Sequence, residues 1–174
     1  SLAKRISSRL SPAHRDGRTG FGTFGVLDFM ITALTLAPIL AAVVILVMPE
    51  GRARAVALGG ALLALALTVC LLLRFEVGEG LQFVEKTAWI PALDVDYFVG
   101  LDGTNALVLL LAALLAPLVV LASWEHEDRP RTYFALLSVQ FTGLFGVFTA
   151  LNFFHWFLYW ELALVPAFFL IKLL

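Results

Sequence analysis

Residues 153–174 read FFHWFLYWELALVPAFFLIKLL, with Glu161 and Lys172 as the charged side chains of an otherwise largely apolar block. A block of about twenty apolar residues forms a helix long enough to cross the ~30 Å hydrocarbon core of a bilayer. Glu161 lies about eight residues into the block, roughly 12 Å deep at a rise of ~1.5 Å per residue. The stretch therefore predicts a membrane-spanning helix with a carboxyl group in its middle.

Similar apolar blocks precede this one along the chain. In total, 61% of the residues are hydrophobic and 14% are charged, whereas soluble domains are about half apolar and a quarter charged. A soluble bundle would interrupt such blocks with polar residues every turn or two. We therefore expect an all-α membrane protein with about five transmembrane helices in a membrane domain at 27–174. The expected spans are 27–48, 55–73, 104–123, 132–151 and 153–174.

Residues 1–26 form a basic N-terminal tail in which Asp16 is the acidic residue. The Arg- and Ser-rich composition is typical of a mitochondrial transit sequence, and a plain basic tail at the membrane surface is an equal alternative. Because the chain begins with Ser1 rather than Met, we expect a processed or truncated start.

The loop at 74–103, between the second and third spans, is the one long connection. The segment Asp94–Val99 alternates polar and apolar residues, as a half-exposed strand does. With Phe83–Trp89 it predicts a possible β-hairpin that turns near Pro91. An irregular acidic loop is the alternative.

Basic residues favour one orientation of the spans. Cytoplasmic loops are enriched in Lys and Arg, and the two short connectors carry more of these residues than the long loop does. We therefore expect the connectors inside and the long loop outside, although the basic tail favours the reverse. The residues compared are Arg52, Arg54, Arg129 and Arg131 in the connectors, and Arg74 and Lys86 in the loop.

Glu161 is the strongest candidate for a functional residue. A charged side chain at this depth costs several kcal/mol unless it meets water, a partner or a proton. A low dielectric favours the neutral carboxyl, whereas a nearby cation favours the carboxylate, and this competition suits proton transfer. Pro166 has no amide hydrogen and leaves the carbonyl of Leu162 without its helical donor, which loosens the helix beside Glu161. The alternative is a Glu that only specifies helix packing.

Other polar side chains in the spans are weaker candidates for a polar relay or for hydrogen bonds between helices. Gln140 is suited to an interhelical hydrogen bond. His155 lies near the start of its span, at the expected level of the lipid headgroups, and about 120° around the helix from Glu161. Lys172 is about 16 Å along the axis from Glu161, too far for an ion pair, so we expect it to reach the interface.

Several residues indicate structural roles. Asp102, followed by Gly103, is expected to cap the amides at the start of the third span. Trp124 stands where an interfacial aromatic residue belongs. Gly59 and Gly60 allow close approach of a neighbouring helix.

The sequence shows no nucleotide-binding loop, metal-ligand cluster or catalytic nucleophile, and Cys70 is its single cysteine. We therefore expect no cofactor, metal ion or redox centre in this chain. No basic patch interleaved with aromatic residues indicates a nucleic-acid partner.

A set of motifs along residues 27–174 resembles the antiporter-like membrane subunits of respiratory complex I (NADH:quinone oxidoreductase). The form W-E-x-x-L-x-P is most similar to subunit M of the bacterial enzyme, called subunit 4 in mitochondria, and to its counterpart in the photosynthetic relative of the complex. The motifs are Trp89-Ile90-Pro91, Tyr97, Gly100-Leu101-Asp102-Gly103, Ser123-Trp124, Gly146-Val147-Phe148 and the run from Trp160 to Pro166.

The resemblance implies a proton-translocating subunit in which Glu161 pairs with a lysine on a later, broken helix. NADH, FMN, iron–sulfur clusters and quinone would then bind elsewhere in the complex. The implied partners are other membrane-arm subunits, the remainder of the same subunit, and lipids, in a mitochondrial inner membrane or a bacterial plasma membrane. Family members are longer, with two inverted repeats, so we expect the N-terminal part of a larger or split subunit. Asn152 and His155 depart from the family pattern.

Two alternatives remain open at this stage. The first is a subunit of a multi-subunit cation/proton antiporter or membrane-bound hydrogenase of the same fold. The second is a non-pumping membrane scaffold.

Overall fold

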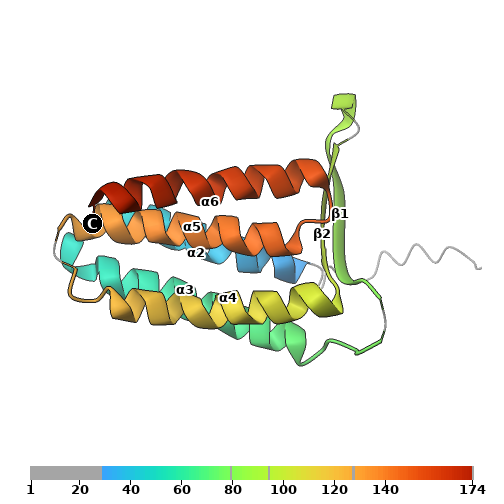
Figure 1. Cartoon of the computed structure of the whole chain (residues 1–174), viewed down its shortest axis with the longest axis horizontal. Coiled ribbons are helices and arrows are strands. Elements are labelled where there is room, and N and C mark those ends of the chain that lie inside the picture. Colours follow the sequence, from blue (N-terminus) through green and yellow to red (C-terminus); the bar gives the residue numbers. More distant parts are fainter. Residues whose placement is uncertain (1–28, 79, 94, 127, 174) are drawn as a thin grey trace, which may run out of the picture.

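The computed structural model describes residues 29–173 apart from 79, 94 and 127, and within them five long helices and one two-stranded sheet (Figure 1). Each long helix is apolar enough to cross a membrane. This confirms the expected all-α membrane fold with a hairpin, whereas the expected tail at 1–26 lies outside the described residues. The helices are α2 (Met30–Val47), α3 (Ala53–Leu72), α4 (Gly103–Ala122), α5 (Pro130–Thr149) and α6 (Phe153–Leu173), and the strands are β1 (Gln82–Ile90) and β2 (Val95–Leu101).

The five helices form a bundle around α5. Helix α5 contacts each of the other four, whereas α6 packs mainly against α5 at one edge (Figure 1). In the most apolar stretch of α5, 61% of the residues are buried, against 17% in α6. The outer face of α6 is therefore open in the described part of the chain.

Small side chains line the contact faces of the bundle. The buried positions of α3 are mostly alanines, spaced three or four residues apart, which lets helix backbones approach closely. A Cβ added at Gly60 would lie 2.6 Å from the Cβ of Ala41 on α2, whereas nothing lies within 4 Å of a Cβ added at Gly59. The predicted close approach is therefore confirmed at Gly60 and is not found at Gly59.

Two further glycines bring α5 against α6. A Cβ added at Gly143 would lie 2.6 Å from the amide nitrogen of Ala163 and 2.8 Å from the carbonyl oxygen of Tyr159. A Cβ added at Gly146 would overlap the ring of Tyr159. Because backbone and ring occupy the space of the missing side chains, these glycines set both the distance and the rotation of α6.

The hairpin lies across one end of the bundle, and the short connectors lie at the other end (Figure 1). Strands β1 and β2 are antiparallel, with Lys86 opposite Phe98, and the chain reverses at a short 3₁₀ helix, η3 (Pro91–Leu93). A second short 3₁₀ helix, η2 (Glu50–Arg52), precedes α3. The structure thus contains the predicted hairpin with its turn at Pro91, rather than an irregular loop.

The hairpin also holds the corner between α5 and α6. The amide of Leu151 donates a hydrogen bond of 3.0 Å to the carbonyl of Phe98, and Val99 pairs with Ala150 as an isolated bridge. The start of α6 is therefore attached to β2 as well as to α5.

We predict that Gly143→Ala destabilises the protein, because the added methyl group would meet the backbone of α6. Overpacking of this kind costs about 1–3 kcal/mol, so the unfolding temperature in detergent should fall. Gly59→Ala is the matched control, since its methyl group meets no atom within 4 Å and Ala is the better helix former. Equal unfolding temperatures for the two variants would contradict the tight α5–α6 contact.

Candidate functional site

Glu161 lies in the middle of α6, on the face that no described helix covers. The bundle-facing side of α6 carries buried or half-buried residues at intervals of three or four, and Glu161 is exposed on the other side. Within the described residues its carboxyl makes no hydrogen bond or ion pair. The bundle-facing residues are His155, Tyr159, Ala163, Pro166 and Leu170.

The surroundings of Glu161 on this open face are apolar. Phe157, Leu164, Val165 and Phe168 are all exposed along the same side of α6. A carboxylate among such side chains is costly in lipid unless a partner or a proton neutralises it. The geometry therefore requires that whatever covers this face also meets the carboxyl.

Lys172 lies in the last turn of α6, on the same flank as Glu161 but far along the axis. Its ammonium group stands 4.6 Å from the ring centroid of Phe168, a distance at which a cation is attracted to an aromatic face. Within the described residues it forms no ion pair with Glu161, in agreement with the separation expected from the sequence.

Pro166 is buried inside α6. Helix α6 continues through it to Leu173, so the missing amide leaves the Leu162 carbonyl without its usual donor but does not end the helix. Pro38 in α2 and Pro117 in α4 are likewise buried inside helices, and neither was singled out from the sequence.

His155 is enclosed under the hairpin rather than open at the membrane surface. Its side chain is only 6% exposed, and its ring centroid lies 4.9 Å from that of Trp89 and 4.8 Å from that of Tyr97. The Nδ1 atom has no hydrogen-bond partner among the described residues. The sequence located His155 near the start of its span but gave no indication of this aromatic enclosure.

The polar residues expected to have structural roles behave differently from one another. Oδ1 of Asp102 accepts hydrogen bonds from the amides of Thr104 (2.9 Å) and Asn105 (2.7 Å), which confirms the predicted cap. Gly103 begins α4, and nothing lies within 4 Å of a Cβ added there. Trp124 follows α4 and is 38% exposed, as an interfacial residue can be.

Gln140 is half-buried on α5. In the part of the chain that the structure describes, its side chain forms no hydrogen bond with a neighbouring helix. Its role in linking helices stays a prediction.

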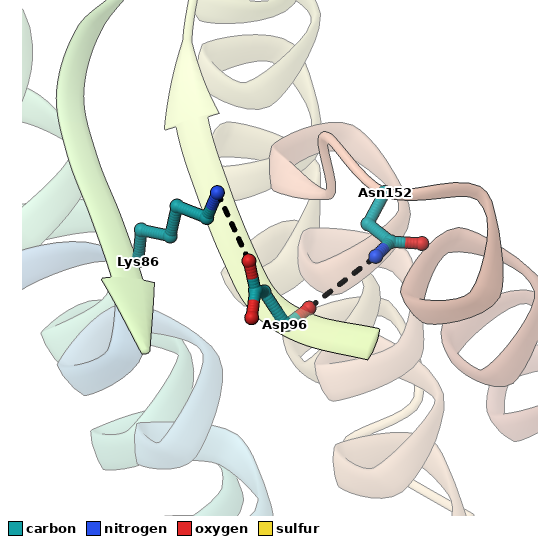
Figure 2. Close-up of polar contacts among 3 residues, drawn as sticks. All are labelled: Lys86, Asp96 and Asn152. Carbon is teal, nitrogen blue, oxygen red and sulfur yellow. Dashed lines mark hydrogen bonds and ion pairs between the residues drawn. The ribbon is translucent and has the colours of Figure 1, made fainter. Parts of the chain in front are cut away.

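Asn152 positions the first turn of α6. Its Oδ1 accepts a hydrogen bond of 2.9 Å from the amide of Phe154, and its Nδ2 donates one of 3.4 Å to the carbonyl of Asp96 on β2. Figure 2 shows this contact beside the ion pair between Lys86 and Asp96, 2.9 Å long, which links the two strands. Asn152 therefore acts as an N-terminal cap that is also attached to the hairpin.

Sequence reasoning missed the role of Glu85, which it counted only as an acidic loop residue. Glu85 is 7% exposed, and its carboxylate accepts hydrogen bonds from the amide of Ile31 (2.7 Å), the amide of Thr32 (3.2 Å) and the Thr32 hydroxyl. An isolated acid on a strand carries no local sign of burial. The signal appears only when β1 is placed over the start of α2.

Tyr97 extends this polar contact. Its hydroxyl lies 2.7 Å from that of Thr32. Burial raises the pKa of Tyr97 above its ordinary value of 10.0, so the phenol stays protonated and can donate at neutral pH. Tyr97 therefore joins the hairpin to α2 through neutral hydroxyl groups.

Among the described residues, no group of three or more His, Cys, Asp or Glu side chains is placed to hold a metal ion. The free thiol of Cys70 is half-buried on α3. The chemistry on view is thus that of proton-carrying and hydrogen-bonding groups.

Comparisons with known proteins give consistent similarities. No protein-family model matches the chain. It is 38% identical over 116 residues to F(420)H(2) dehydrogenase subunit M of Methanosarcina mazei, covering 66% of this chain and 23% of that protein. It is 32% identical over 148 residues to NAD(P)H-quinone oxidoreductase chain 4 1 of Nostoc sp., covering 82% of this chain and 28% of that protein.

A solved structure shares the fold. A chain of respiratory complex I from Thermus thermophilus with bound NADH superposes with a TM-score of 0.67 at 27% identity, covering 79% of this chain and 27% of that chain. The present chain thus spans about a quarter of the length of the proteins it matches.

We predict that Asp102→Ala destabilises the start of α4, because two amides lose their acceptor. Loss of such a cap costs about 1 kcal/mol, which is measured as a lower unfolding temperature and faster hydrogen exchange at residues 104 and 105. Asp102→Asn keeps an acceptor oxygen and should stay close to the parent. If both variants lose the same stability, the charge of Asp102 rather than its capping bonds is responsible.

Proposed function

Since the chain belongs to the antiporter-like membrane subunits of complex I-type enzymes and matches their N-terminal part, we propose that it is a proton-translocating membrane-arm subunit of NADH:quinone oxidoreductase. The observation that carries the proposal is the position of Glu161. Its carboxyl stands midway along an apolar helix and on the face left open for further protein.

Glu161 is the group that would hold the transported proton. In an apolar site without a cation the neutral carboxyl is favoured, and a cation brought close favours the carboxylate. A lysine supplied by the remainder of the subunit, as the family resemblance implies, would therefore release the proton on approach and restore it on withdrawal. This chain contributes the acid half of the pair.

Neighbouring residues would support this transfer. Pro166 leaves the backbone carbonyl of Leu162, next to Glu161, without a helical donor, which offers an acceptor for water. Gln140, His155 and Lys172 would supply further polar groups along the bundle. None of them replaces Glu161, because His155 faces the hairpin and Lys172 lies at the far end of α6.

The chain itself would bind no electron carrier. The names of its relatives contain different donors, F(420)H(2) in one and NAD(P)H in the other, although this part of the sequence is similar in both. We infer that the donor, the FMN, the iron–sulfur clusters and the quinone bind to other subunits of an energy-coupling membrane complex. The partners of the chain would be other membrane-arm subunits, the remainder of the subunit and lipids.

We predict that Glu161→Gln in the assembled complex lowers proton translocation at least about tenfold, since a positioned proton-transfer group commonly contributes ~100-fold or more. Proton uptake into inverted vesicles is measured during NADH-driven quinone reduction, with the quantity of assembled complex determined in parallel. Glu125→Gln, an exposed change in the connector after α4, is the matched control and should leave uptake unchanged.

Normal assembly with unimpaired proton uptake in Glu161→Gln would favour the scaffold instead. Co-purification with flavin and iron–sulfur subunits separates the proposed enzyme from a cation/proton antiporter, which has no need of them.

A further inference from the structure

Helix α2 takes its N-terminal cap from the hairpin rather than from its own flank. Its N-cap residue, Phe29, makes no capping bond through its side chain, and the first turn contains no acid. The first amides of a helix lack intrahelical partners and carry a partial positive charge that favours an anion. The Glu85 carboxylate meets both needs for Ile31 and Thr32 from 54 and 53 residues away.

A series of hydroxyl groups continues from this carboxylate to α6. The Thr32 hydroxyl bonds to Glu85 and to the Tyr97 hydroxyl. The Tyr159 hydroxyl on α6 in turn interacts with Tyr97 and with Thr35, one turn further along α2. Hairpin, α2 and α6 are thereby joined by side-chain hydrogen bonds in one place.

Ring contacts reinforce the same junction. His155 is enclosed between Trp89 and Tyr97, and the ring of Tyr159 occupies the space above Gly146 of α5. The inner face of the first two turns of α6 is therefore held between the hairpin and α5. Only its outer face is free of contacts with described helices.

We propose that Glu85, Thr32, Tyr97 and Tyr159 form a latch that sets the rotation of α6 and so positions Glu161. Tyr159 precedes Glu161 by two residues, about 200° around the helix, so a Tyr159 held inward directs Glu161 outward to the open face. These four are positioning residues, because none of them touches the carboxyl of Glu161. The functional consequence rests on the proton-transfer role proposed for Glu161.

The ionised form of Glu85 is essential to the latch. A carboxylate offers only acceptors, and both of its oxygens accept bonds here. A glutamine amide would turn a donor toward the amides at the helix start or leave one of them unpaired. Glu85→Gln therefore disrupts the first link, while Thr32→Val and Tyr97→Phe remove single hydroxyl groups further along with little change of shape.

The experiment measures two quantities in the intact complex that contains the full subunit. Hydrogen exchange is followed by mass spectrometry in peptides covering 29–36 and 153–162, and protons translocated per electron pair are measured in vesicles. The variants are Glu85→Gln, Thr32→Val and Tyr97→Phe. Thr32→Ser, which keeps the hydroxyl, and Lys86→Met, which removes only an ion pair on the outside of the hairpin, are the matched controls.

We expect exchange at the start of α2 to accelerate about tenfold in Glu85→Gln, as the loss of a hydrogen bond to a charged group predicts. Exchange in 153–162 should accelerate in all three variants, and the number of protons per electron pair should fall while the complex still assembles. A displacement of about 1 Å at a reacting group can cost ~100-fold in rate, so a small rotation of α6 is sufficient. Both controls should behave as the parent does.

Faster exchange confined to 29–36, with 153–162 unchanged, would overturn the latch. So would Thr32→Ser losing as much as Thr32→Val. If Glu161→Gln translocates protons normally, the proposed function fails, but the exchange rates in 153–162 still decide whether the latch exists.

Discussion

The ends of helices make the strictest demand on this chain. Each helix leaves amides and carbonyls without intrahelical partners, and hydrocarbon offers none in exchange. Helix α4 meets the demand with the adjacent Asp102, α6 with the adjacent Asn152, and α2 with Glu85 from the hairpin. Because the last of these caps comes from β1, the hairpin and the bundle depend on each other.

The placement of α6 follows from this dependence. The α5–α6 corner pairs with β2, Asn152 bonds to the same strand, and glycines on α5 leave room for Tyr159. All of these contacts act on one face of α6 near its start. The opposite face, with Glu161 among apolar side chains, is therefore presented at a defined rotation to whatever protein lies beside it.

Local features of the sequence were sufficient for much of this architecture. Apolar blocks predicted the five helices, the alternation at 94–99 predicted β2, and the Asp102 cap is confirmed because a cap lies within three residues of the amides it serves. The enclosure of His155 and the burial of Glu85 were missed. Each depends on Trp89, Tyr97 or Thr32, residues brought close only by the fold.

The sequence by itself determined which segments enter the membrane and that one of them carries a carboxyl group near its middle, because transfer to hydrocarbon depends on the composition of about twenty consecutive residues. It could not determine which way that carboxyl points. The rotation of α6 is set by Gly143, Gly146 and the hairpin, and such long-range steric and hydrogen-bonding contacts exist only once α2, α5, α6 and the two strands have come together.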